Sequence, residues 1–346
     1  MPQIIQPGIQ IPIPQGPSPL DVMQDGHEYE SILNHTYSNL DIVKEIRRSI
    51  GEVQQSRNNT PLICYVANVL NGGIGNSIDG TDDMPFREMV ASLPADKTEI
   101  DIVLVTSGGL ANQVVNFVNV LRPRFTKVSF ILLDMAMSAG SIFIMSGDEI
   151  IMSRQSKFGP IDPQVPGKDG RYVPAQSILL AINEIQVRGQ KAIDNHMQPN
   201  WTDVQMLKNI DMRDVGSAIG ASNYSIQITK EYLEKYKFST WTNHLQSGIP
   251  VTPQERKDKA EQIAGILCDH GKWKSHGHFI DRNTAWTECG LKIIHSESIQ
   301  GLDRAMRRMW ALFYWLFEST PILKFFISDN YCIIRQKQII KLPVKP

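Results

Sequence analysis

Apolar runs alternate with segments of helical periodicity between residues 62 and 153. The runs 62–70, 101–106 and 128–133 are short, mostly apolar and rich in β-favouring residues. Continuous apolar runs of this length are typical of strands buried on both faces of a parallel sheet. The succession of strand, helix and strand predicts parallel pairing with right-handed crossovers. The pattern therefore predicts an α/β fold.

The segments on either side are predicted from composition and spacing. Residues 1–20 alternate Ile with Pro, Gln and Gly, which predicts a flexible arm or a strap over another surface. Residues 29–55 predict a lead-in helix. Apolar residues at helical spacing in 174–197 predict a helix that packs on the sheet or on a sister subunit. A capping-box pattern at 202–205 predicts a further helix start.

The C-terminal part carries an aromatic stripe. Large apolar residues recur at helical spacing over 302–317, with three arginines nearby, and predict a helix that docks on the core or on a partner. The alternative is an amphipathic segment over 302–327 that contacts a membrane surface. Residues 322–327 and the Ile-rich end predict an edge strand. The predicted parts are an N-terminal arm with a lead-in helix, an α/β core, a helical extension with a His-rich loop, and a packing or assembly tail (1–57, 58–240, 241–299 and 300–346).

Composition limits the function classes. The chain has 346 residues, 42% of them hydrophobic, and a formal net charge of −1, so it offers no basic footprint for nucleic acid. Its four cysteines form no CxxC pair, which argues against a disulfide scaffold or a zinc site and favours a reducing cytoplasm. The glycines at 72–75 lack nucleotide-loop spacing, so no cofactor is expected. We also expect no signal peptide and no membrane span.

Two junctions between a predicted strand and a predicted helix carry the candidate chemistry. One contains Gly108 and Gly109, and the other places Ser138 among small residues. Because the carboxyl ends of parallel strands meet at one sheet edge, both junctions are expected there. A serine beside free backbone amides is the arrangement that acyl transfer needs. Taken singly, a serine at a helix start is more often only a cap, and the glycines are more often a simple helix entry.

The residues also resemble a known family. Ser107-Gly108-Gly109, Met137-Ser138-Ala139-Gly140-Ser141 and the run 158–164 resemble the Clp protease and crotonase superfamily, most closely its signal peptide peptidase A-like branch of serine dehydrogenase (SDH) proteinases. The segment 271–276 is similar to that branch's Gly-Lys-Trp-Thr-His motif. The resemblance covers about residues 60–295. It implies a spiral α/β fold of β-α-β units with a helical C-terminal half, a nucleophile at Ser138, oxyanion donors at Gly108 and Gly109, with Ala139 as a third candidate, and a homo-oligomer.

A serine needs a base to act as a nucleophile. The loop 156–164 contains no histidine, so the histidine of Clp proteases has no counterpart there. The resemblance leaves Lys191 and His276 as rivals, and Lys157 and Lys168 as weaker alternatives. Lowering a lysine pKa by roughly 3 units costs about 4 kcal/mol, whereas an imidazole is already poised near pH 7.

The run 158–164 has candidate roles beside the base. Asp162 either orients the base or caps a turn, and Gly159 and Pro160 are candidates for a substrate loop. We therefore predict a serine peptidase that hydrolyses peptide or protein substrates through Ser138. A catalytically silent assembly or binding protein of the same fold is the alternative, and a crotonase-like acyl-CoA enzyme is a third class.

Overall fold

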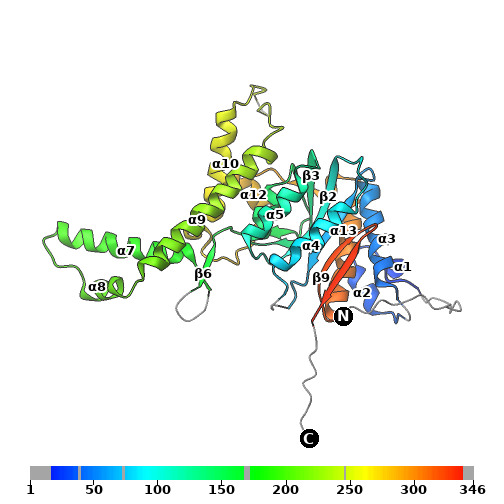
Figure 1. The fold of residues 1–346 in the computed structure, drawn as a ribbon, viewed down its shortest axis with the longest axis horizontal. Helices are drawn as coiled ribbons and strands as arrows, with labels where there is room; N and C mark the ends of the chain where they lie inside the picture. Colours follow the sequence, from blue (N-terminus) through cyan, green and yellow to red (C-terminus); the bar gives the residue numbers. More distant parts are fainter. Residues whose placement is uncertain (1–16, 38–39, 72–74, 167–171, 245–246, 338–346) are drawn as a thin grey trace, which may run out of the picture.

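The computed structural model describes residues 17–37, 40–71, 75–166, 172–244 and 247–337. Within these residues one eight-stranded sheet has the order β10, β9, β1, β2, β3, β4 and β8, and β5 pairs with β3 beyond β4 (Figure 1). The strands from β1 to β5 and β8 are parallel, so the predicted α/β class with a mostly parallel sheet is confirmed. Their bounds are β1 (Leu62–Ala67), β2 (Glu99–Thr106), β3 (Lys127–Ala136), β4 (Glu149–Met152), β5 (Lys157–Phe158), β8 (Ile294–His295), β9 (Ile322–Ser328) and β10 (Cys332–Gln336).

Helices cover both faces of the sheet. Successive side chains of a strand point to opposite faces, so Tyr65 and Phe130 pack in one core while Cys64 and Ile131 pack in the other. The first core is closed by α4 (Asp83–Ala91), α5 (Ala111–Leu121), α6 (Ala139–Met145), α10 (Pro253–Cys268) and α12 (Arg282–Cys289). The second is closed by α1 (Pro19–Val22), α2 (Glu28–Leu33), α3 (Ile42–Ser56) and α13 (Leu302–Ser319). Residues 1–16 of the predicted arm and the glycines at 72 and 73 lie outside the described residues. The end of the predicted arm is helical, because Pro19 and Leu20 begin α1 and are buried.

The C-terminal segment completes the sheet. The aromatic stripe of α13 is buried in the second core, so the prediction of a packing helix is confirmed. The edge-strand prediction is confirmed for the Ile-rich end, because β10 lies at the sheet edge. It was wrong for 322–327, because β9 pairs with β1 on one side and with β10 on the other. Six of the seven residues of β9 are buried, as expected of an inner strand, and four of these six are apolar.

Three helices form an arm that extends away from the sheet (Figure 1). They are α7 (Ala175–Asp194), α8 (Trp201–Lys208) and α9 (Met212–Tyr232), joined to the core through the strand pair β6 (Gln164–Pro166) and β7 (Tyr172–Pro174). Only Ala175 and Ile185 of α7 are buried, because this helix packs on α9 and not on the sheet as one alternative predicted.

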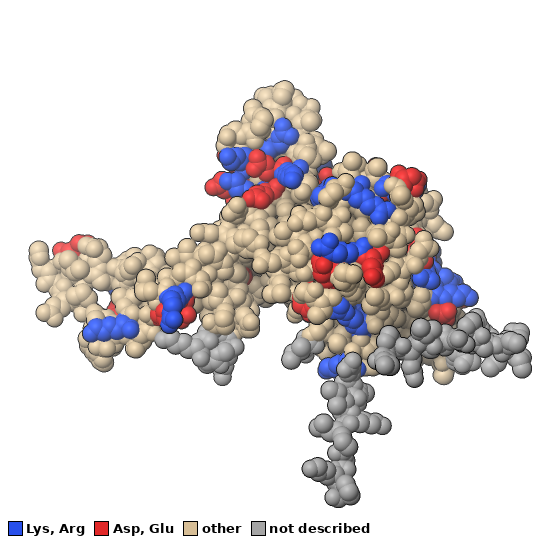
Figure 2. All heavy atoms as spheres, in the orientation of Figure 1, with Lys and Arg blue, Asp and Glu red and all other residues tan. Residues whose placement is uncertain are grey.

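The arm leaves many apolar side chains exposed, and its visible face carries few charges (Figure 2). A role in assembly stays a prediction. The capping-box prediction at 202–205 was wrong, because the side chain of Asn200 accepts the amide hydrogen of Thr202 and caps α8. Among the described residues, no helix is both long and apolar enough to cross a membrane.

A lysine that follows α9 is expected to make the stability of the fold depend on pH. Lys237 ends the turn that follows α9, and its Nζ donates to the carbonyl oxygen of Asp148 at 3.2 Å. Removal of this ammonium from water lowers its pKa to about 8, against the opposing charges of Glu149 and Asp148. The unfolded chain therefore holds more protons between about pH 8 and pH 10, and the free energy of unfolding rises with pH over that window.

Lys237→Met is expected to remove this rise, which is on the order of 2 to 3 kcal/mol. Urea unfolding at pH 7 and pH 9.5 measures it, with Lys235→Met as the control because Lys235 is exposed. An unchanged pH dependence in Lys237→Met would contradict the assignment.

Candidate active site

Ser138 occupies a strained turn between β3 and α6. Its backbone has φ 50° and ψ −115°, a region that non-glycine residues rarely adopt and that costs about 1 to 3 kcal/mol. Ser141 supports the turn, because its hydroxyl donates to the carbonyl of Ala136 at 2.8 Å and accepts the amide hydrogen of Gly159 at 3.0 Å. The Ser138 side chain is partly exposed, and it forms no hydrogen bond with any described residue. A sharp strand-to-helix turn of this kind presents a hydroxyl at the sheet edge.

The glycine junction lies directly against this serine. Thr106 of β2 pairs with Ala136 of β3, which sets the two junctions side by side as predicted. Gly108 has φ 101°, and a Cβ atom added there would lie 2.8 Å from the Cβ of Ser138 and 2.7 Å from the carbonyl oxygen of Met137. Only glycine fits this close approach.

The backbone amides of this junction differ in their hydrogen bonds. The Gly108 amide donates to the Thr106 hydroxyl at 3.1 Å, so it is already engaged. Ile78 donates its amide to the Gly108 carbonyl at 2.7 Å and accepts the Leu110 amide at 2.9 Å, which turns the Gly109 amide away from Ile78. Among the described residues the Gly109 amide has no acceptor.

Ala139 begins α6, where backbone amides lack a helical partner. Its amide has no acceptor among the residues the structure describes, which matches the Gly109 amide on the other side of Ser138. Of the three backbone amides predicted as oxyanion donors, those of Gly109 and Ala139 therefore have no acceptor among the described residues.

A buried carboxylate near the same edge holds two histidines. Asp162 is fully buried, its Oδ1 lies 2.8 Å from Nδ1 of His276, and its Oδ2 lies 3.0 Å from Nδ1 of His270. An ionised carboxylate only accepts hydrogen bonds, so both Nδ1 atoms donate to it, and in a neutral imidazole this leaves Nε2 as an acceptor. Asp162 thus holds two imidazoles, and its role in orienting a catalytic base stays a prediction.

The strand register places this group at the end of the sheet where Ser138 lies. β5 runs parallel to the end of β3 with Phe158 beside Ala136, and Phe158 exchanges backbone hydrogen bonds with Ile280 at 3.0 and 2.8 Å. Ser138 and Asp162 follow these paired positions, and His276 precedes Ile280 on the antiparallel segment, so all three leave the sheet at the same end.

The loop with Gly159 and Pro160 packs beside the serine turn. A Cβ added to Gly159 would lie 2.3 Å from Cε of Met137 and 3.4 Å from the carbonyl oxygen of His278. Gly159 and Pro160 are buried. They therefore support the serine turn from the interior.

The only cysteine thiol adjacent to Asp162 among the described residues is Cys268. Burial, with the charge of Asp162 as a lesser cause, raises the pKa of Cys268 to about 12. The thiol therefore stays protonated near neutral pH, and it does not compete with Ser138 as a nucleophile.

A family of known proteins matches the part of the chain that contains Ser138. The family model described as ClpP-like SDH-type serine proteinase matches residues 74–244. These residues, just under half of the chain, are therefore similar to that family. The match spans both junctions, the turn at Ser138 and Asp162, and it ends before the two histidines that Asp162 binds.

Individual relatives cover part of the chain. Two uncharacterized proteins of Methanocaldococcus jannaschii are 30% identical over 164 residues and 33% identical over 182 residues, which is 47% and 51% of this chain. The chain spans 51% and 57% of their lengths. A mutant of ClpP1 from Listeria monocytogenes is a similar solved structure, with 14% identity, a TM-score of 0.25, and coverage of 46% of this chain and 83% of that one.

The lysines that were predicted as candidate bases do not belong to the group around Asp162. Lys191 is exposed in the last turn of α7, whose 20 residues extend about 30 Å along the arm. Lys157 pairs with Asp134 at 2.8 Å, and Lys168 lies outside the described residues. Neither Lys191 nor Lys157 contacts Asp162 or its histidines.

His276 lies on the predicted loop between α10 and α12. α10 begins with a capping box of Thr252 and Glu255, and α12 ends at Gly290 with φ 65°. The sequence interpretation missed His270, which stands in the short helix α11 (His270–Trp273). Its only signal was its place in a His-rich segment, because the shared carboxylate lies more than a hundred residues earlier.

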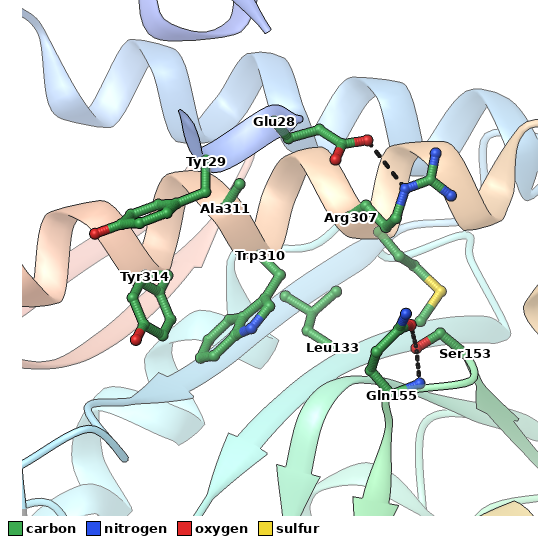
Figure 3. A pocket seen from close by; sticks show the side chains of 10 residues that line it. Glu28, Tyr29, Leu133, Ser153, Gln155, Arg307, Trp310, Ala311 and Tyr314 are labelled. Carbon is green, nitrogen blue, oxygen red and sulfur yellow. Dashed lines mark hydrogen bonds and ion pairs between the residues drawn. The ribbon is translucent and has the colours of Figure 1, made fainter. Parts of the chain in front are cut away.

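A cavity of about 330 Å³ lies apart from this site (Figure 3). Tyr29, Trp310 and Tyr314 line it together with the end of β3 and the loop after β4. The Arg307 side chain at one end is paired with Glu28 at 3.0 Å and with Asp303. None of the predicted site residues lines this cavity.

Proposed function

We propose that the chain is a serine peptidase with Ser138 as nucleophile, His276 as general base and Asp162 as the residue that orients the base. The observation that carries the proposal is the buried Asp162 carboxylate bound to Nδ1 of His276 at the sheet edge where Ser138 sits in a strained turn. The ClpP-like SDH-type match supports the same reaction class.

The proposed reaction follows from the acceptor and donor atoms of these groups. Nε2 of His276 removes the proton from Ser138 while Oγ attacks the peptide carbonyl carbon, and the developing oxyanion is bound by the Gly109 and Ala139 amides. The imidazolium then gives its proton to the leaving amine, which leaves an acyl-enzyme. A water molecule, deprotonated by His276, releases the acyl group and restores Ser138.

His276 is preferred over His270 because of the segments that carry them. The His276 segment continues into Ile280, which pairs beside the end of β3. The His270 amide instead donates to Oε1 of Gln176 at 3.0 Å, which ties that histidine to the start of α7. Asp162 holds both rings, so His270 is assigned a supporting position.

A fluorophosphonate probe tests the proposal. We expect one covalent adduct per folded chain on the tryptic peptide that contains Ser138, identified by mass spectrometry, and none in heat-denatured protein. His276→Ala is expected to slow labelling by about 10²- to 10⁴-fold, because a positioned general base contributes that much. His270→Ala, the matched control on the same carboxylate, is expected to slow it by less than about tenfold. An adduct on another serine, or equal rates in the two variants, would contradict the assignment.

A further inference from the structure

A buried lysine of the C-terminal strand lies behind the glycine junction. Lys324 in β9 is 0% exposed, and its Nζ donates to the carbonyl oxygen of Ser77 at 2.6 Å and to the two carboxylate oxygens of Asp82 at 2.9 and 2.8 Å. An ammonium group has three hydrogens to donate, so all of them find acceptors here. Lys324 lies outside the residues that match the ClpP-like SDH-type family.

Asp82 is the centre of this network. It is 0% exposed and accepts hydrogen bonds from the Tyr65 hydroxyl at 2.8 Å, from Arg335 at 2.9 Å and from the Asp79 amide at 3.1 Å. A buried ion pair gives little net stability relative to apolar residues of the same volume, so we look to its effect on the position of the backbone. The network fixes the backbone at 77–82 to β1, β9 and β10.

The held segment is the outer wall of the proposed oxyanion site. Ser77 precedes Ile78, whose amide donates to the Gly108 carbonyl at 2.7 Å and whose carbonyl accepts the Leu110 amide at 2.9 Å. A Cβ added to Gly109 would lie 2.2 Å from the Ile78 carbonyl oxygen, so the two backbones are in contact.

The contacts then continue to the nucleophile, because the Gly108 backbone touches Ser138. A continuous path therefore runs from Nζ of Lys324, through the Ser77 carbonyl and Ile78, to the Gly109 amide. Displacement of Ser77 would move the Gly109 amide.

We propose that Lys324 is a positioning residue for the oxyanion site, and that β9 is in this way a functional part of the peptidase core. The inference rests on the proposed serine peptidase activity. Because an oxyanion donor acts on charge that develops only in the transition state, its displacement lowers kcat and leaves KM nearly unchanged.

The test compares three forms of the full chain in hydrolysis of a fluorogenic peptide. The first form, Lys324→Met, leaves the Asp82 charge without its buried partner. The second form is therefore the double variant Lys324→Met with Asp82→Asn, which removes both charges together. The third form, Lys127→Met, is the control, because Lys127 forms an ion pair with Glu149 at the opposite end of the strands.

In the double variant kcat is expected to fall by about 10- to 100-fold, with KM within about twofold of the original value and an unchanged pH profile. The affinity for a peptide boronate, whose tetrahedral adduct places an oxygen in the oxyanion site, is expected to fall by the same factor. Lys127→Met is expected to keep kcat, KM and boronate affinity.

Unchanged kcat and boronate affinity in the folded double variant would overturn the proposal. A fall in kcat that only tracks the fraction unfolded, measured by circular dichroism at the assay temperature, would overturn it too. Absence of a Ser138 adduct in the unmodified protein would instead be a failure of the proposed peptidase activity, and the two failures are therefore distinct.

Discussion

Replacement of Ser138 with alanine is expected to reduce peptide hydrolysis by on the order of 10⁴- to 10⁶-fold, because the proposed acyl-enzyme cannot form without the hydroxyl. Residual turnover would come from substrate binding and the oxyanion amides alone. Initial rates with a fluorogenic peptide measure the effect. Retention of more than about a hundredth of the original kcat would remove Ser138 from the mechanism.

Ser138→Gly separates catalysis from backbone strain. It is expected to be as inactive as Ser138→Ala, but more stable than that variant by about 1 kcal/mol, because glycine adopts φ 50° without the cost borne by alanine. Urea unfolding of the two variants gives this difference directly. Equal stability would mean that the turn stores no strain at this residue.

Asp162→Asn is expected to give the second largest loss, a fall in kcat of about 10³- to 10⁴-fold. The carboxylate accepts from two imidazoles, whereas an amide has a single acceptor oxygen beside an NH₂ donor. One of the two histidines must therefore change tautomer or lose its bond. If that histidine is His276, Nε2 becomes a donor and no longer accepts the serine proton.

Asp134→Asn is the matched control for this change. Asp134 lies on β3 and pairs with Lys157 at 2.8 Å, so it shares the sheet edge but touches neither histidine. Its substitution is expected to change kcat by less than about threefold, as for a partly exposed ion pair. Equal losses in the two variants would indicate a general electrostatic effect of the edge and would contradict the orienting role of Asp162.

Much of the fold was predictable because its signals are local. The strands β1, β2 and β3 are buried on both faces. Strands buried in this way have continuous apolar sequences, so their composition was enough to predict them. The two junctions followed from the same reasoning, since the carboxyl ends of parallel strands share one edge. The capping box at Thr252 and the left-handed Gly290 are local in the same sense, because each depends on only a few neighbouring residues.

Other elements were predicted less well because their surroundings are distant in the chain. α7 has an apolar stripe, but its partner is α9, and a stripe alone does not name its partner. β9 was predicted at an edge because the sequence does not record the order of strands. Its pairing with β1 depends on contacts across more than two hundred residues.

The sequence by itself was enough to predict the parallel core, the serine and the glycines beside it. Strand burial and the strand-to-helix turn each depend on residues that are neighbours in the chain. Only the tertiary structure decided which groups gather at the sheet edge where that serine lies. It brought His270 and His276 onto Asp162 from over a hundred residues away, and it placed Lys324 behind Gly109 through Ile78. Hydrogen bonds of a side chain are set by distance in space, and residue types along the chain do not encode that distance.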